Sequence, residues 1–67
     1  MQFDLNIRMT NDAFADLPGH ELARILRGVA DRLQDYTPEI GDARPVLDYN
    51  GHVVGQYKIR RTRRAGG

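Results

Sequence analysis

The chain has 67 residues, 40% of them hydrophobic, no cysteine and a formal net charge of +1. A chain of this length is expected to form one domain that buries only about 60% of the surface its unfolded form exposes, which argues against a large enclosed active site. The absence of cysteine excludes disulfides and thiolate-ligated zinc, so further burial is expected from homo-oligomerisation or from a larger partner.

The charge is divided unevenly along the chain. Residues 58–67 hold five cations and no acid, whereas residues 1–57 hold five cations and nine acids, a net charge of −4. Blocks of like charge are usually solvated interaction segments. No apolar stretch approaches the roughly 20 residues of a membrane span, and the N-terminus lacks the pattern of a signal peptide. We therefore expect a soluble intracellular protein with an acidic body and a basic tail.

A strand is predicted at the N-terminus. From Gln2 to Met9 polar and apolar residues alternate strictly, which is the period of a strand covered on one side. Residues 10–12 then supply turn-forming oxygens, and residues 13–15 predict a short helical turn that returns the Phe14 ring to the core. The two faces of the strand consist of Phe3, Leu5, Ile7 and Met9 on one side and of Gln2, Asp4, Asn6 and Arg8 on the other.

Residues 18–36 are predicted to form an amphipathic helix. Pro18 suits the first turn, Glu21 complements the helix dipole, and Pro38 prevents continuation. A charge at Leu26 is expected to unfold the domain, because that residue belongs to the apolar stripe. The stripe has helical spacing and comprises Leu22, Ile25, Leu26, Val29 and Leu33.

A loop over residues 37–45, anchored by Ile40, leads into a hairpin whose turn has two interpretations. Asn50-Gly51 can be the centre of a two-residue type I′ turn, or residues 48–51 can form a type I turn with Gly51 left-handed in a G1 bulge. The two turns differ by one residue in pairing, and therefore in the side chains that face the core.

The first turn puts the Asp48 carboxylate among core residues. We favour the second, because an unpaired buried carboxylate is costly. It sets Leu47 opposite Val53 and continues the apolar side through Gly55, Tyr57 and Ile59. The residues then expected to face outward are Val46, Asp48, His52, Val54, Gln56, Lys58 and Arg60.

The element order predicts an α+β fold of the type β-α-β-β. A helix of about 18 residues spans ~27 Å and carries the chain back past the first strand, so the first two strands run parallel and the third runs antiparallel to both. A three-stranded antiparallel sheet of order 2-3-1 follows, with the helix on one face and the other face uncovered. We expect one domain over residues 1–59 and a flexible basic tail over residues 60–67.

Two motifs, HELARILRGVADRL and VLDYNGHVVG followed by Tyr57, resemble those of small uncharacterised proteins encoded by phages and prophages. In that group a helix of pattern E-x-A-R-I-L-R precedes a hairpin of pattern D-x-N-G-N-x-V-G. The resemblance covers residues 2–59, with His52 in place of asparagine and the RRTRRAGG extension outside it. It implies an accessory protein of phage or mobile-element origin in the cytoplasm of a bacterial host. Analogy with anti-CRISPR proteins suggests an inhibitor of host defence.

The sequence supplies no catalytic constellation. It contains neither cysteine nor serine, and no base stands at a recognisable spacing from Thr10, Thr37 or Thr62. His20 and His52 are 32 positions apart and form no metal-ligand pair by spacing. We expect no enzymatic activity, no metal, no cofactor and no small-molecule substrate.

Nucleic-acid binding is the alternative function, because a basic cluster gives a sequence-independent, salt-sensitive affinity for phosphate. No aromatic residue lies among the arginines, so the tail offers no base stacking. The final Gly66-Gly67 resembles the end of ubiquitin-like modifiers, but those have two strands before the helix, and we expect no such role here. The candidate nucleic-acid-binding residues are Lys58, Arg60, Arg61, Arg63 and Arg64.

Binding to a protein is the function that we favour from sequence. One helix leaves one sheet face and two sheet edges free, and a homodimer is expected through an edge strand or that face. The acidic loops around Asp12, Asp16, Glu39 and Asp42 suit a basic surface on a host protein. The candidate partner-binding residues are Arg8, Val46, His52 and Val54.

Overall fold

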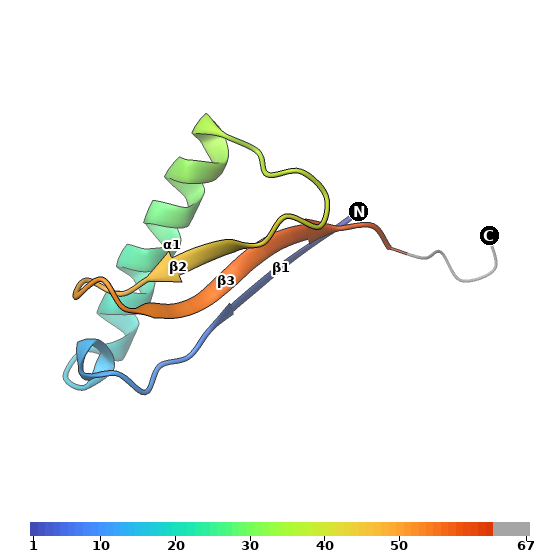
Figure 1. Cartoon of the computed structure of the whole chain (residues 1–67). Helices are drawn as coiled ribbons and strands as arrows, with labels where there is room; N and C mark the ends of the chain where they lie inside the picture. The colour runs from blue at the N-terminus through green and yellow to red at the C-terminus, as the bar shows by residue number, and fades with distance from the viewer. Residues whose placement is uncertain (63–67) are drawn as a thin grey trace.

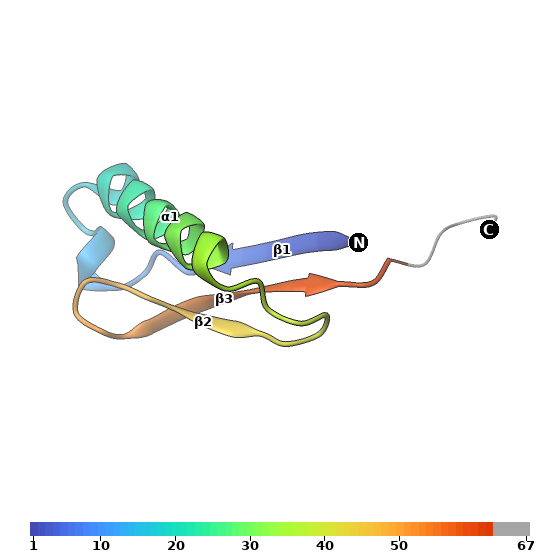
Figure 2. The same cartoon turned by 90° about the horizontal axis from the view of Figure 1, so that it is seen from above.

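A three-stranded antiparallel sheet with one helix on one face makes up the part of the chain that the computed structural model describes, residues 1–62. The elements are β1 (Gln2–Ile7), the 3-10 helix η1 (Asp12–Phe14), α1 (Pro18–Asp35), β2 (Arg44–Leu47) and β3 (Val53–Arg60). The sheet has the order β1-β3-β2, and β3 runs antiparallel to both neighbours (Figure 1). Figure 2 shows α1 lying on one side of this sheet. The predicted β-α-β-β fold is confirmed.

The helix has nearly the predicted bounds, but its buried face is rotated. Pro18 occupies the first turn, and the Arg32 carbonyl accepts the N–H of Tyr36, the C-cap residue, at 2.8 Å. Leu26 is 42% exposed, so its prediction as a core residue is wrong. The reason is that α1 approaches η1 and β2 most closely, which turns a neighbouring row of side chains inward. The buried residues of the helix are Glu21, Ile25 and Val29.

The core lies between α1, η1 and the helix-side face of the sheet. Phe14 is buried there, as predicted from its place after the N-terminal strand. Complete burial of a large apolar side chain of this kind stabilises a fold by about 1.5–3 kcal/mol. The buried hydrophobic residues are Ala13, Phe14, Ile25, Val29, Val46, Val54 and Tyr57, with Leu5, Ile7 and Leu33 packed at their margin.

The hairpin contains the predicted type I turn with a G1 bulge. The Gly51 N–H donates to the Asp48 carbonyl at 3.0 Å, and Gly51 has a φ of 85°. The Asp48 N–H donates to the His52 carbonyl at 2.9 Å, and Leu47 pairs with Val53. Glycine is needed at position 51 because few other residues tolerate this left-handed conformation.

The predicted faces of the hairpin are nevertheless wrong. Val46 and Val54 are only 0% and 2% exposed, whereas Leu47 and Val53 are exposed. The cause is an irregularity in β3: Val46 pairs with Gly55 and Leu47 pairs with Val53, so Val54 is an extra residue without a partner in β2. Such a bulge shifts the side-chain alternation by one, and Val54 joins the core face that continues beyond it.

Gly55 marks the closest approach between β3 and β1. A Cβ atom at this position would overlap the carbonyl of Asn6, so only glycine fits. The Arg8 N–H extends the pairing by donating to the Val54 carbonyl at 2.7 Å. β1 is therefore held along its whole length against β3.

The loop before β2 is attached differently from the prediction. Ile40 is exposed and is not the anchor of this loop, whereas Pro38 is buried. The Gly41 N–H donates to the Ile59 carbonyl at 2.8 Å and ties the loop to the end of β3. In residues 1–62, no helix combines the length and apolar character needed to cross a membrane.

Candidate functional site

The Asp48 carboxylate organises the hairpin loop, residues 48–52, from within. Its side chain is fully buried and accepts the N–H groups of Asn50 and His52, each at 2.9 Å. The Asn11 side-chain amide donates to the second carboxylate oxygen at 3.0 Å and joins the loop to the segment before η1. Asn11 is the main cause that lowers the pKa of Asp48 below its ordinary value, and the two N–H groups act in the same direction against burial. The buried carboxylate is thus satisfied by three donors.

A second buried carboxylate, that of Glu21, holds the same loop from outside. Arg24 binds it through two hydrogen bonds of 2.7 and 2.9 Å, one helical turn away. The Tyr49 N–H donates to Glu21 Oε2 at 3.0 Å, which links the first turns of α1 to the tip of the hairpin. Arg24 is the main cause that lowers the pKa of Glu21, and the Tyr49 N–H adds to it while burial acts in the opposite direction.

The side chains that this framework displays form one continuous surface at the hairpin end of the molecule. Tyr49 is 62% exposed although its backbone is fixed, and Leu17 beside it is also exposed. A shallow depression of about 180 Å³ lies between the loop, η1 and the start of α1. We call its exposed residues the loop-end surface: Asp12, Asp16, Leu17, His20 and Tyr49.

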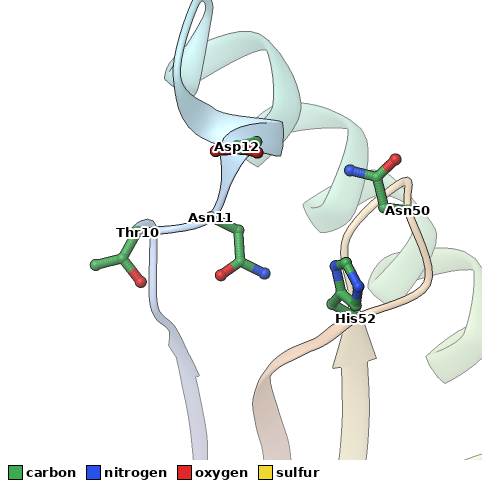
Figure 3. A pocket seen from close by; sticks show the side chains of 5 residues that line it. All are labelled: Thr10, Asn11, Asp12, Asn50 and His52. Atoms are coloured by element: carbon green, nitrogen blue, oxygen red, sulfur yellow. The ribbon is translucent and has the colours of Figure 1, made fainter.

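A larger depression of about 430 Å³ lies on the other side of the hairpin loop. Figure 3 shows Thr10 and Asn11 on the segment after β1, and Asn50 and His52 on the loop opposite. The His52 ring is exposed, with Nδ1 3.6 Å from Asp48 Oδ2, which is too long for a hydrogen bond. The lining of this larger depression is polar. The depression therefore places amide and imidazole groups beside the loop-end surface.

The predicted basic residues are only partly brought together. Lys58 and Arg60 lie on the sheet face away from α1, since they alternate with Tyr57 and Ile59. Asp4 lies opposite Lys58 and forms an ion pair with Arg60 at 2.5 Å, which offsets part of this positive charge. Arg61 is exposed, and the predicted residues Arg63 and Arg64 lie outside the described part of the chain.

Two of the four predicted partner-binding residues are misplaced. Val46 and Val54 are core residues and form no part of an accessible surface, because the bulge in β3 turns them toward α1. Arg8 and His52 are exposed, the first at the end of β1 and the second on the hairpin loop. The apolar residues that the uncovered sheet face does present are Leu47 and Val53.

The turn interpretation indicates that the Asp48 side chain bonds within its own loop, as it does, but the sequence interpretation missed the contacts of Glu21 and the hydrogen bond from Asn11 to Asp48. Glu21 lies four residues before Ile25 and eight before Val29, so the three side chains share one face of the helix. This spacing indicates that Glu21 is buried beside the two apolar residues. Arg24 stands three residues later, at ion-pair spacing. The partnership of Asn11 with Asp48 has no comparable signal, because 37 residues separate them. Among residues 1–62, no three His, Asp or Glu side chains gather as metal ligands would.

Comparison of the chain with protein-family models, with curated proteins and with solved structures found no match. The resemblance to small phage-encoded proteins therefore remains a prediction from the two motifs.

Proposed function

We propose that the chain is a non-enzymatic protein-binding domain of phage or mobile-element type, whose loop-end surface docks on a host protein. The observation that carries this proposal is the fixed backbone beneath an exposed tyrosine. Glu21 and Asp48 together accept three N–H groups of the hairpin loop, so Tyr49 is presented without a large entropic cost of ordering on binding.

The chemistry of the surface supports a protein partner. Tyrosine is enriched among interface residues that contribute most to affinity, and an adjacent exposed leucine enlarges the apolar centre. Asp12 and Asp16 border that centre, and the charge of Glu21 is matched by Arg24. A surface of this kind suits a partner with an apolar pocket surrounded by basic residues. Inhibition of a host defence system is the role that the phage resemblance adds to the proposal.

The test is affinity capture from a bacterial lysate with two matched tyrosine variants. Tyr49→Ala removes the centre of the loop-end surface and is expected to weaken binding by about 30-fold, as loss of an interface hot spot of ~2 kcal/mol does. Tyr36→Ala is the control, because Tyr36 is similarly exposed at 54% but lies at the far end of α1. Equal retention of partners by both variants contradicts the proposed surface.

Nucleic-acid binding is the second candidate, supported by Lys58 and Arg60 on one sheet face and by the arginines that follow them. The full chain and a form ending at Ile59 are compared for binding to random DNA and RNA at about 50 and 200 mM salt. Tight binding that collapses in the higher salt and disappears on truncation supports this candidate and argues against a protein-only function. If neither form binds DNA or RNA, nucleic-acid binding is excluded as the function.

A further inference from the structure

β1 presents a free sheet edge with its hydrogen-bonding groups intact. The Arg8 N–H donates to Val54, and the carbonyl of Asn6 lies against Gly55, so the even-numbered residues turn their backbone groups toward β3. Backbone groups alternate along a strand. Those of Phe3, Leu5 and Ile7 therefore point to the free edge, where none of the described residues pairs with them.

The opposite edge of the sheet is poorly suited to pairing. β2 has only 4 residues, and Pro45 has no N–H to donate. Short strands and prolines are the usual protection of an edge. β1 has 6 residues and no proline, so it is the edge open to a further strand.

The helix-side face of β1 is also incompletely covered. α1 approaches η1 and β2 more closely than β1, and Phe3 and Met9 remain exposed beside the half-buried Leu5 and Ile7. Leu26, on the flank of α1, is exposed as well. Apolar surface next to an unpaired edge is best buried by another strand of matching pattern.

β1 is complementary to itself in one antiparallel register. With Asn6 opposite Asn6 of a second copy, Asp4 faces Arg8 on both sides of the two-fold axis, and Leu5 faces Ile7. Two neighbouring registers also keep the apolar residues on one face, but neither pairs Asp4 with Arg8. A register centred on Asp4 sets two carboxylates opposite each other, which is destabilising. A register centred on Leu5 sets Asp4 opposite Asn6.

We propose that two copies of the chain pair through β1 in the Asn6-centred register and form a continuous six-stranded sheet. Leu5 and Ile7 provide edge hydrogen bonds, while the Asn6 and Asp4–Arg8 positions form the non-hydrogen-bonded pairs, in which side chains approach more closely. Both helices then lie on the same face. The hairpin loop lies at the same end of the sheet as the end of β1 (Figure 1), so the two loop-end surfaces point in opposite directions and stay free. The dimer does not depend on the proposed host-protein function.

Sedimentation of the intact protein and cross-linking of a single-cysteine variant test the dimer. The parent is expected to sediment with twice the monomer mass at micromolar concentration. Asn6→Cys, in a chain with no other cysteine, is expected to form a disulfide-linked dimer on mild oxidation. Non-hydrogen-bonded pairs have Cα atoms about 4.5 Å apart, within the disulfide range of roughly 4.4–6.8 Å. Gln56→Cys is the control, because Gln56 is the partner of Asn6 on β3 and lies one strand inward.

A charge pair tests the register itself. Asn6→Lys and Asn6→Asp each set like charges opposite each other across the two-fold axis, and each is expected to raise the dimer dissociation constant about fivefold. An equimolar mixture of the two variants restores the dimer, whereas Gln56→Lys leaves it unchanged. A monomer mass for the parent, or equal cross-linking of the two cysteine variants, overturns the proposal.

Discussion

The Glu21 carboxylate accepts the backbone N–H of Tyr49 at 3.0 Å, across 28 residues of sequence, and so joins the first turns of α1 to the tip of the β2–β3 hairpin. The same carboxylate is bound by Arg24 through two hydrogen bonds. Asp48 completes the arrangement by accepting two N–H groups within the loop. The loop is therefore constrained from its own turn and from the helix.

Glu21→Gln is expected to loosen the hairpin loop while the fold persists. The amide keeps the shape of the side chain, but the charge that attracts Arg24 and the Tyr49 N–H is lost. Hydrogen bonds to charged groups contribute about 1.5–3 kcal/mol, so the Tyr49 amide should exchange with solvent at least about tenfold faster. Amide hydrogen exchange followed by NMR measures this, with Glu39→Gln on an exposed loop as the control. Unchanged exchange at Tyr49 would contradict the assigned contact.

Stability should fall in acid because of the same two carboxylates. Their pKa values in the folded state lie below the ordinary values of 3.8 for Asp48 and 4.5 for Glu21, so the unfolded chain binds more protons in acid. The stabilisation is fully present above about pH 5 and is lost as the pH falls through the ordinary values toward the folded ones. Urea unfolding between about pH 3 and 7 should show a shallower pH dependence for Asp48→Asn than for the parent.

Asn11→Ala tests the cause of the Asp48 shift. It keeps the carboxylate but removes the amide donor that lowers the pKa of Asp48 most. Its pH dependence should lie between those of the parent and of Asp48→Asn. Identical curves for all three proteins would show that the contacts of Asp48 do not contribute to acid stability.

Two adjacent helix residues should respond very differently to truncation. Ile25 is buried and Leu26 is 42% exposed, although both were predicted in the core. Ile25→Ala should destabilise the domain by about 2–5 kcal/mol, whereas Leu26→Ala should cost ~1 kcal/mol or less. Thermal unfolding followed by circular dichroism distinguishes them. An equal loss of stability in the two variants would contradict the exposed position of Leu26 and support the helix face that the sequence predicts.

Substitution by alanine should change the stability of the domain in opposite directions at two glycines. A Cβ atom at Gly28 meets nothing within 4 Å, so Gly28→Ala should stabilise the domain by about 0.5–1 kcal/mol through the higher helix propensity of alanine. Gly55→Ala should destabilise it strongly, because the new Cβ overlaps the carbonyl of Asn6. Chemical denaturation of both variants measures the difference. A stabilising Gly55→Ala would place β1 farther from β3 than described.

Local patterns in the sequence were sufficient for the elements and for their order. The alternation from Gln2 to Met9, the spacing of Ile25 and Val29, and the type I turn over residues 48–51 each reflect interactions between residues close in sequence. The antiparallel order with β3 central follows from the length of α1 and from the hairpin, which leave few alternative topologies. Turn chemistry likewise indicated the conformation of Gly51, whose φ is 85°.

Tertiary packing decided which side chains are inside and which groups meet. The bulge at Val54 lies next to Gly55, where β3 approaches β1 most closely, and no local pattern predicts it, so the faces of Val46 and Val54 were predicted wrongly. Asp48 is buried because Asn11 and two backbone N–H groups satisfy it, whereas the sequence prediction assumed that a buried carboxylate there would be unpaired. The sequence by itself thus determined the elements and their connections, which depend on neighbours along the chain. Only the folded structure brought Asn11 to Asp48 and the Tyr49 N–H to Glu21, because 37 and 28 residues separate these partners in the chain.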